Sequence, residues 1–195
     1  EAVSDGAKGA IADGREVRAI GHRVVHGGPK YGASAEVTDA VLADIEAFAV
    51  YAPLHNPANA VGIRAARKVF GGVPHIAVFD TAFHQTMPEY AYRYGIPYDL
   101  ADQHGIRRYG FHGQSHQYVS QRTAILLGRP LRDLKLVSCH ICSGTSIAAI
   151  LHGMDNKSFE ALDERVIEFP AALVGAAVTT AVFFWLTVRH LRRMD

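Results

Sequence analysis

Five polar side chains stand where predicted strands or helices end, which is where ligands gather in α/β proteins. They are Arg23, His55, Asp80, His112 and His140. A guanidinium presents a fixed fork of donors that matches the oxygens of a carboxylate or a phosphate. Arg23 lies beside apolar valines in a predicted strand and therefore indicates an anion site. A strand arginine held in an ion pair is the alternative.

The eleven histidines of the chain raise the question of a metal site, because imidazole is a common ligand of transition metals. His22 and His26 share a face of a predicted strand. His112 and His116 share a helix face if that helix begins early enough. No HExxH pattern occurs and no carboxylate stands at ligand spacing beside either pair, so we assign no metal-binding residue.

A C-x-x-C pattern spans Cys139 to Cys142, and these are the only two cysteines. In a redox protein of the thioredoxin type this pattern opens a helix that acidifies the first thiol. Here a turn and a strand follow instead, so we expect two small residues packed at a strand end. Two cysteines are also too few for the disulfide framework of a secreted domain and suit a reducing compartment.

The first half of the chain predicts strands alternating with helices, which indicates an α/β domain. Residues 15–28 predict a strand that ends in a Gly-containing loop. Thr38 predicts the N-cap of an amphipathic helix that Pro53 ends. Asn56 predicts the cap of a second helix, with Pro57 next, running to about Val69. Residues 74–79 then predict a buried strand with Asp80 at its carboxyl end.

The second half predicts a long ordered loop, a helix and two strands. Residues 84–109 are rich in Tyr, Pro and Gly and predict a loop with little regular structure. Residues 115–127 predict a helix, with Gly128 at its C-terminal cap position. Residues 134–151 predict two strands around a Gly-containing turn. Each of the five polar side chains named first thus stands at an end of a different predicted strand or helix.

Five sequence blocks together resemble the acetate kinase family, which includes propionate kinases. They are GHRVVHGG, APLHNPAN, AVFDTAFHQTMP, YGFHGQSH and HICSGTSIAAI, in the family's order and spacing between Ala19 and about Ile150. The resemblance implies a partial fold of the actin, sugar kinase and heat-shock ATPase type, which is ribonuclease H-like. It assigns residues 1–150 to a region that carries an acyl-phosphate site.

By this resemblance the reaction is reversible phosphoryl transfer between ATP and acetate, giving ADP and acetyl phosphate in the cytoplasm. Such a reaction depends on positioning and on donors around the transferred oxygens. The resemblance implies catalytic roles for Arg23, Asp80 and His112. Arg23 matches the arginine that holds carboxylate and phosphoryl oxygens, and His112 matches a histidine that donates to those oxygens. Asp80 matches an essential carboxylate near the acetyl group.

The resemblance also implies the residues that bind the substrate and the phosphates. A small apolar pocket for the acetyl methyl group matches Val25, Leu54 and Phe111. Such a pocket discriminates one methylene by only about 1–3 kcal/mol, so propionate is a further candidate substrate. His55 matches a supporting histidine. The phosphate- and nucleotide-binding positions are His140, Ser143 and Gly144. The resemblance implies ATP or ADP and Mg²⁺ as cofactors. It also implies a homodimer.

The chain departs from the family pattern in its phosphate loops. A Ser-rich loop of the form N-x-G-S-S-S-x-K does not precede Ala19. The second loop is usually H-x-G-N-G, whereas Cys142 and Ser143 stand at its third and fourth positions here. Glycine lets the main chain approach a phosphate, and a cysteine side chain restricts that approach. We therefore expect weak or no turnover from this chain alone.

The segment after Ile150 matches nothing in the family pattern, including its adenosine-binding part. Residues 169–188 are twenty consecutive uncharged residues, which is about the length of a transmembrane helix. A buried helix of a larger protein is the equal alternative. We treat 151–195 as a divergent tail, and expect a truncated or fused reading frame from Leu151 or Met154 onward. The absence of an initiator Met predicts that the natural chain begins earlier.

Charge and rival functions limit the interpretation further. The net charge is +1, which disfavours nucleic acid as a partner. Besides an acetate kinase-like enzyme, the sequence allows a membrane-tethered, catalytically inactive binding module that reuses the kinase fold. A metal-dependent hydrolase built on the histidines is the third and weakest alternative. Recovery of a Ser-rich loop upstream and an adenosine segment downstream would favour the enzyme.

Overall fold

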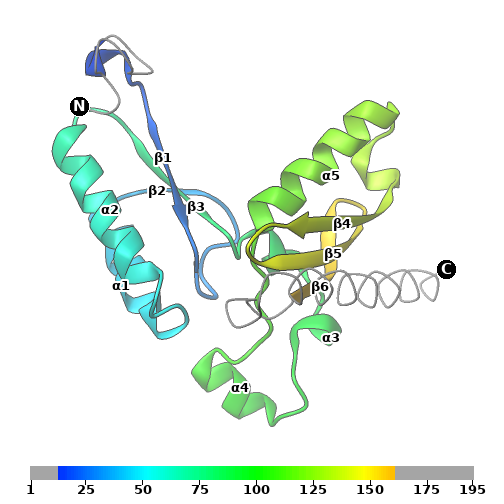
Figure 1. The fold of residues 1–195 in the computed structure, drawn as a ribbon. Coiled ribbons are helices and arrows are strands. Elements are labelled where there is room, and N and C mark those ends of the chain that lie inside the picture. Colours follow the sequence, from blue (N-terminus) through cyan, green and yellow to red (C-terminus); the bar gives the residue numbers. More distant parts are fainter. Residues whose placement is uncertain (1–12, 161–195) are drawn as a thin grey trace, which may run out of the picture. The chain divides into compact units, whose positions relative to one another are not determined.

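The computed structural model describes residues 13–160, which belong to two compact units (Figure 1). Unit 1 comprises the described part of Glu1–His26 together with Ser34–Val78. Unit 2 comprises Gly27–Ala33 and the described part of Phe79–Asp195. The strands and helices of both units confirm the predicted α/β class. The apolar run at 169–188 lies outside the described residues, and inside them no helix is long and apolar enough to cross a membrane.

Unit 1 is built on a three-stranded sheet in the order β1-β3-β2. A short 3₁₀ turn, η1 (Gly14–Glu16), precedes β1 (Ile20–Val24), and β2 (Ala35–Glu36) pairs antiparallel with β3 (His75–Phe79). Alternate residues of β3 are buried, as expected for a strand whose two faces have different surroundings. Asp80 follows β3 directly, which confirms its predicted position at the end of this strand.

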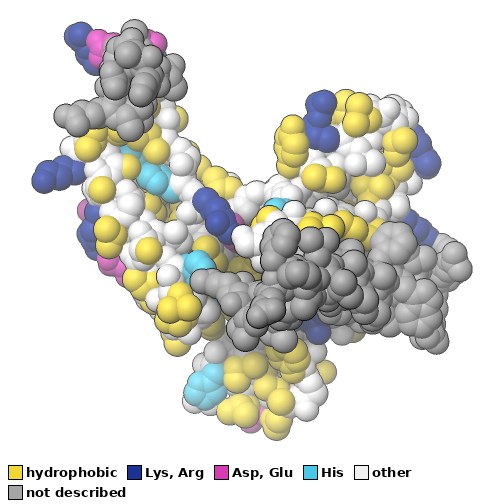
Figure 2. Space-filling model, in the orientation of Figure 1, with side chains coloured by type: hydrophobic (Ala, Val, Ile, Leu, Met, Phe, Trp, Pro, Cys, Tyr) yellow, Lys and Arg dark blue, Asp and Glu magenta, His cyan; other side chains and the backbone are white. Residues whose placement is uncertain are grey.

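Two helices of unit 1 follow the predicted pattern. Thr38 caps α1 (Asp39–Ala47) by accepting a hydrogen bond from the Val41 amide at 3.2 Å. The short η2 (Phe48–Val50) leads on to α2 (Asn56–Val69). Basic and acidic side chains lie next to one another on this part of the surface in Figure 2. Arg67 of α2 pairs with Asp39 of α1 at 2.8 Å. This mixed surface lacks the one-sided basic charge of a nucleic-acid site.

Asn56 is not the cap of α2, contrary to the sequence analysis. His55 holds the N-cap position, and Asn56 is the first helical residue, with its side chain fully buried. The Asn56 carboxamide accepts from the His26 amide at 3.1 Å and donates to the carbonyls of His26 and Ile45, each at 3.0 Å. Because the side chain satisfies main-chain groups of two other segments, it cannot turn back to cap its own helix.

Unit 2 is built on an antiparallel meander in the order β4-β5-β6. The strands are β4 (Lys135–Ile141), β5 (Thr145–Leu151) and β6 (Met154–Glu160), and β6 was not predicted. β5 is the central strand and is buried from Thr145 to Ile150, which explains its continuous run of small and β-branched residues. Phe83, Ala148 and Ile150 form a core cluster with Leu136 packed against it.

A long helix of unit 2 begins two residues earlier than predicted. It is α5 (Gly113–Leu127), and Gly128 ends it in the left-handed conformation with φ 61°, as the sequence indicated. The 3₁₀ turn η4 (Leu131–Asp133) then leads on to β4. The helix contacts β4 and the segment around Phe83. The helix therefore packs against the meander.

The predicted loop at 84–109 contains more regular structure than its composition indicated. It includes η3 (Phe83–Thr86), α3 (Glu89–Tyr92) and α4 (Tyr98–His104). A proline precedes both α3 and α4, and Gly105 ends α4 with φ 61°. Arg93 ties the helices together by binding Asp102 at 2.9 Å and Glu89. Helices this short carry too few residues for a periodic apolar pattern, so the sequence did not reveal them.

The buried carboxamide of Asn56 provides a test of unit 1. We expect Asn56→Ala to lower the free energy of unfolding by about 3 kcal/mol, because three hydrogen bonds are lost in a site screened from water. Asn59→Ala is the matched control. Its half-buried side chain accepts one bond, from the Val25 amide at 3.1 Å, so its loss should be about 1 kcal/mol. Urea unfolding followed by circular dichroism compares them, and equal losses would contradict this role of Asn56.

Candidate active site

His112 stands at the junction between the end of β3 and the start of α5. It is the N-cap of α5 and has a left-handed backbone with φ 57° and ψ 23°. The next amide, of Gly113, donates to the carbonyl of Asp80 at 3.0 Å. A Cβ atom at Gly113 would collide with that carbonyl, so only glycine allows this approach. Two predicted catalytic residues, Asp80 and His112, are thereby held next to one another within unit 2.

The imidazole rings of His112 and His140 are stacked, and Nδ1 of each ring is hydrogen-bonded to a serine. Their ring centroids lie 4.1 Å apart with an interplanar angle of 18°. His112 Nδ1 lies 2.9 Å from Ser146 Oγ, and His140 Nδ1 lies 2.9 Å from Ser115 Oγ. A hydrogen bond at Nδ1 fixes the orientation of each ring, and His140 Nε2 lies 3.1 Å from Cys142 Sγ. Two residues predicted to contact phosphoryl oxygens are thus brought together with defined orientations.

His116 lies behind this pair and is completely buried. Its Nε2 lies 2.8 Å from the same Ser146 hydroxyl, and its Nδ1 lies 2.9 Å from Ser138 Oγ. Burial lowers the pKa of His116 to about 3, and repulsion from nearby histidines, His84 first, adds to the effect. The ring is therefore neutral at ordinary pH, and it connects two serines of the sheet.

His84 fixes the main chain just before His112. Its Nε2 lies 2.8 Å from the Phe111 carbonyl, and its Nδ1 lies 2.7 Å from a carboxylate oxygen of Asp155 at the start of β6. Both His84 and Asp155 are buried. A Cβ atom at Gly110 would collide with the His84 ring, so the chain passes directly over it. This pair holds the segment from Phe111 to His112 against the meander.

The turn between β4 and β5 contains the predicted phosphate-binding residues Ser143 and Gly144. Within it the Cys142 amide donates to the Gly144 carbonyl at 3.0 Å, and Cys142 Sγ lies 3.3 Å from the same oxygen. Both cysteines are exposed and form no disulfide, so the expectation that they pack at a strand end is wrong. Because the Cys142 amide is used inside the turn, it does not point to a phosphate as a loop amide would.

The fit to ATP and Mg²⁺ is poor in the described part of the chain. The one group of three potential metal ligands found there consists of His112, His140 and Cys142. Mg²⁺ prefers oxygen ligands in octahedral geometry, whereas this set offers two nitrogens and a sulfur. This group of described residues therefore does not suit Mg²⁺. In the turn at Cys142, the Cys142 amide is bonded to the Gly144 carbonyl and is therefore not offered to a phosphate.

The remaining predicted residues lie in unit 1, except Phe111. Arg23 is exposed on β1, and Val25 follows the strand and is buried. Leu54 and His55 lie in the turn before α2, where Leu54 is 81% exposed. Phe111 belongs to unit 2 and is partly buried. The three residues predicted for an apolar acetyl pocket thus divide between the units, and their common role stays a prediction.

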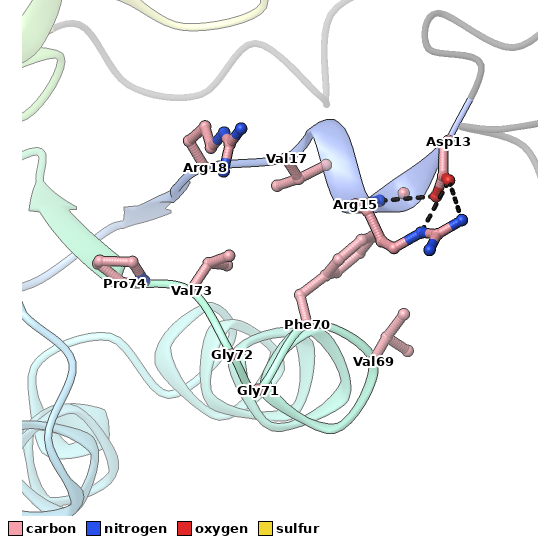
Figure 3. Close-up of a pocket in the computed structure, with 11 residues that line it drawn as sticks. Asp13, Arg15, Val17, Arg18, Val69, Phe70, Gly71, Gly72, Val73 and Pro74 are labelled. Carbon is pink, nitrogen blue, oxygen red and sulfur yellow. Dashed lines mark hydrogen bonds and ion pairs between the residues drawn. The ribbon is translucent and has the colours of Figure 1, made fainter.

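A pocket in unit 1 lies away from all of these residues. It has a volume of about 790 Å³ and is bounded by η1 and by the end of α2, with Phe70 and Arg15 among its lining residues. Figure 3 shows Phe70 reaching toward η1, beside the pair formed by Arg15 and Asp13. No predicted catalytic or substrate-binding residue lines this pocket, so its size alone does not make it the candidate site.

A family model described as the acetokinase family matches residues 5–160. The chain belongs to the acetokinase family. The match extends beyond Ala19 and Ile150 at both ends and includes β6. The family resemblance derived from the five sequence blocks is confirmed.

Curated relatives and solved structures agree with this membership. The chain is 58% identical over 145 residues to an acetate kinase of Bacillus velezensis, covering 74% of this chain and 37% of that protein. A crystal structure of Porphyromonas gingivalis acetate kinase matches with a TM-score of 0.76 and 47% identity, covering 80% of this chain and 40% of that one. A propionate kinase from Francisella tularensis matches with a TM-score of 0.72 and 44% identity, covering 76% and 38%. The chain thus spans less than half the length of these relatives.

Several side chains around the histidine cluster were missed by sequence reasoning. They are Ser115, Ser138, Ser146, His84 and Asp155, which orient the histidines from behind. Ser115 stands three residues after His112, but its partner is His140, 25 positions away. The other contacts join residues at least 22 positions apart, so no local pattern could reveal them.

The close approach at Gly113 predicts a specific sensitivity. We expect Gly113→Ala to lower the free energy of unfolding by about 2–3 kcal/mol, because the Asp80 carbonyl cannot move away from a new methyl group without breaking the start of α5. Gly95→Ala is the matched control in unit 2, since a Cβ atom there meets nothing within 4 Å. Urea unfolding of both variants measures the difference. A loss at Gly113 no larger than at Gly95 would contradict the close approach.

The buried His116 predicts loss of stability in acid. Its pKa is about 3 in the fold and near 6.5 when unfolded, so only the unfolded chain takes up this proton between these values. The free energy of unfolding should fall as the pH drops through this window, by up to about 1.4 kcal/mol per pH unit. Burial also lowers the pKa of His26, to about 4, which adds a similar slope.

Replacing His116 should therefore reduce the acid sensitivity without abolishing it. Urea unfolding of His116→Gln between pH 7 and pH 5 should show a shallower decrease than the unchanged protein. The exposed His104 provides a control, and His104→Gln should keep the original slope. An unchanged slope in His116→Gln would show that this ring does not carry the effect.

Proposed function

We propose that the protein catalyses reversible phosphoryl transfer between ATP and acetate, giving ADP and acetyl phosphate. The observation that supports this most is the stacked pair of His112 and His140, with each Nδ1 engaged by a serine hydroxyl. Fixed donors around a transferring phosphoryl group stabilise its charge without reorganisation. The relatives named acetate kinase and propionate kinase favour acetate as the acceptor, with propionate as a second acid.

Each residue of the chain receives a distinct role in this proposal. His112 donates from Nε2 to a phosphoryl oxygen, and His140 supports the same group. Arg23 offers its planar fork to carboxylate and phosphoryl oxygens, a geometry that lysine cannot reproduce. Asp80 offers its carboxylate near the acetyl group, and its main-chain carbonyl holds the Gly113 amide at the start of α5. These contacts gain strength as charge shifts during in-line transfer.

The accompanying cofactor and partners are proposals from the family alone. Mg²⁺ would accompany ATP and neutralise its phosphates, and its ligands would come from outside the described residues. Val25, Leu54 and Phe111 would contact the acyl group, with His55, Ser143 and Gly144 near the phosphates. The family also suggests a homodimer. A cytoplasmic location would agree with the use of ATP. Membrane contact through 169–188 concerns residues that the structure does not describe.

A chimaera tests the proposed roles directly. Residues 19–150 would replace the matching segment of the Bacillus subtilis acetate kinase, which is 57% identical to this chain over 145 residues. We expect acetate-dependent formation of acetyl phosphate, trapped as the hydroxamate. In this chimaera, Arg23→Ala and His112→Ala should each lower kcat by about 10²–10³-fold, with smaller changes in KM, because both residues act on the transition state.

Two controls separate catalysis from folding. Arg122→Ala removes another exposed arginine of the same segment and should leave kcat unchanged. Arg23→Lys keeps the charge without the fork and should recover only part of the rate. Thermal melting accompanies every variant. A folded chimaera that forms no acetyl phosphate, or an Arg23→Ala variant with normal turnover, would contradict the proposed function.

A further inference from the structure

The turn between β4 and β5 brings a cysteine against two histidines from different elements. His140 lies near the end of β4, Cys142 follows it in the turn, and His112 precedes α5. One ligand atom of each residue lies within 4.8 Å of the others, and Cys142 Sγ is 3.1 Å from His140 Nε2. We propose that His112, His140 and Cys142 form a binding site for a thiophilic divalent transition metal, with Zn²⁺ as the preferred ion.

The serines around the histidines supply the outer contacts that such a site requires. Metal-binding histidines almost always engage their second ring nitrogen in a hydrogen bond, which fixes the tautomer and the ring direction. Here Ser146 engages Nδ1 of His112 and Ser115 engages Nδ1 of His140, both at 2.9 Å. Nε2 is therefore the coordinating atom of each ring. A chance meeting of three surface side chains would not predict this second layer.

The ligand atoms are close to tetrahedral spacing but require a small rearrangement. Bonds of about 2.0–2.1 Å to nitrogen and 2.3 Å to sulfur place ligands about 3.3–3.6 Å apart around zinc. From a separation within 4.8 Å the atoms must close by no more than about 1.5 Å. Nearly parallel rings cannot both direct an in-plane lone pair at one ion, so one ring must turn about its Cβ–Cγ bond. The ring of His140 is the one that can turn, because its partner Ser115 is only partly buried and can follow by rotation about its Cα–Cβ bond.

The donor set selects the class of metal. Two imidazoles and a thiolate suit Zn²⁺ and disfavour Mg²⁺ and Ca²⁺, which prefer oxygen. Binding deprotonates Cys142 and releases that proton to solvent, so it also removes the contact from Sγ to the Gly144 carbonyl. Cys142 and Ser143 are exposed, which leaves the fourth coordination position to water. The site is therefore an open His₂Cys centre.

Metal binding at this site is a property separate from the proposed kinase activity, and it would inhibit that activity. If that proposal holds, zinc occupies the same nitrogens that would donate to phosphoryl oxygens. Zinc should then inhibit phosphoryl transfer, and phosphoryl ligands should compete with zinc. The metal-binding test below uses no kinase assay, so its outcome is independent of the proposed function.

Cobalt titration of the full 195-residue chain, with both cysteines reduced, tests the site. Co²⁺ bound by a thiolate gives a near-ultraviolet charge-transfer band, and tetrahedral Co²⁺ gives intense visible bands. We expect one equivalent of Co²⁺ to produce both, and Zn²⁺ to displace it. Cys142→Ala should abolish the charge-transfer band and weaken Zn²⁺ binding by at least about tenfold. Ser115→Ala keeps all three ligands and should weaken binding by about 10–100-fold.

Cys139→Ala is the matched control, because Cys139 is the second exposed cysteine and lies three residues before Cys142. It should retain both spectral features and the affinity of the unchanged chain. Circular dichroism of each metal-free variant establishes that the fold is kept. The proposal is overturned if Cys142→Ala keeps the band, if Cys139→Ala loses it, or if Co²⁺ produces no thiolate band in the unchanged chain.

Discussion

The hydroxyl of Ser146 is shared by two imidazole rings, and the histidine cluster depends on this sharing. His112 Nδ1 and His116 Nε2 both lie within 2.9 Å of Ser146 Oγ. Ser146 is buried on the central strand of the meander, where water does not replace a lost partner. A hydroxyl carries a single hydrogen, so at least one of the two rings must donate to it. The protonation of His112 is therefore linked to that of a ring buried behind it.

Close packing behind the histidine cluster fixes the main chain on both sides of His112. Asp80 follows β3, and its carbonyl accepts a hydrogen bond from the Gly113 amide. His84 is hydrogen-bonded to the Phe111 carbonyl. Glycine at 110 and 113 allows both approaches. His112 can thus adopt a left-handed backbone, which is uncommon outside glycine and costs energy that the surrounding contacts must offset. Strain of this kind is typical of functional sites.

Local patterns predicted much of the fold, and the family resemblance named most of the site residues. The cap at Thr38, the glycine that ends α5 and the strand before Asp80 each depend on a few neighbouring residues, and each was predicted correctly. Asn56 was misassigned because its side chain bonds to residues 11 and 30 positions away. The serine partners depend on pairings such as that of His140 with Ser146 across β4 and β5, which the sequence alone does not specify.

Among the proton arrangements that satisfy the chain of bonds from Ser138 through His116 and Ser146 to His112, two give His112 opposite roles. If neutral His116 donates from Nε2, the Ser146 hydroxyl donates to His112 Nδ1, and a neutral His112 carries its hydrogen on Nε2. If His116 donates from Nδ1 to Ser138, the Ser146 hydroxyl turns toward His116, and His112 must donate from Nδ1.

The first arrangement presents a donor at His112 Nε2, as phosphoryl oxygens require, and the second presents a lone pair, as a metal requires. A shift of the His116 tautomer is therefore enough to change which kind of ligand His112 can bind. The thiol of Cys142, 3.1 Å from His140 Nε2, favours the metal by adding a soft third ligand. The residue at 142 thus decides how strongly the two uses of these histidines compete.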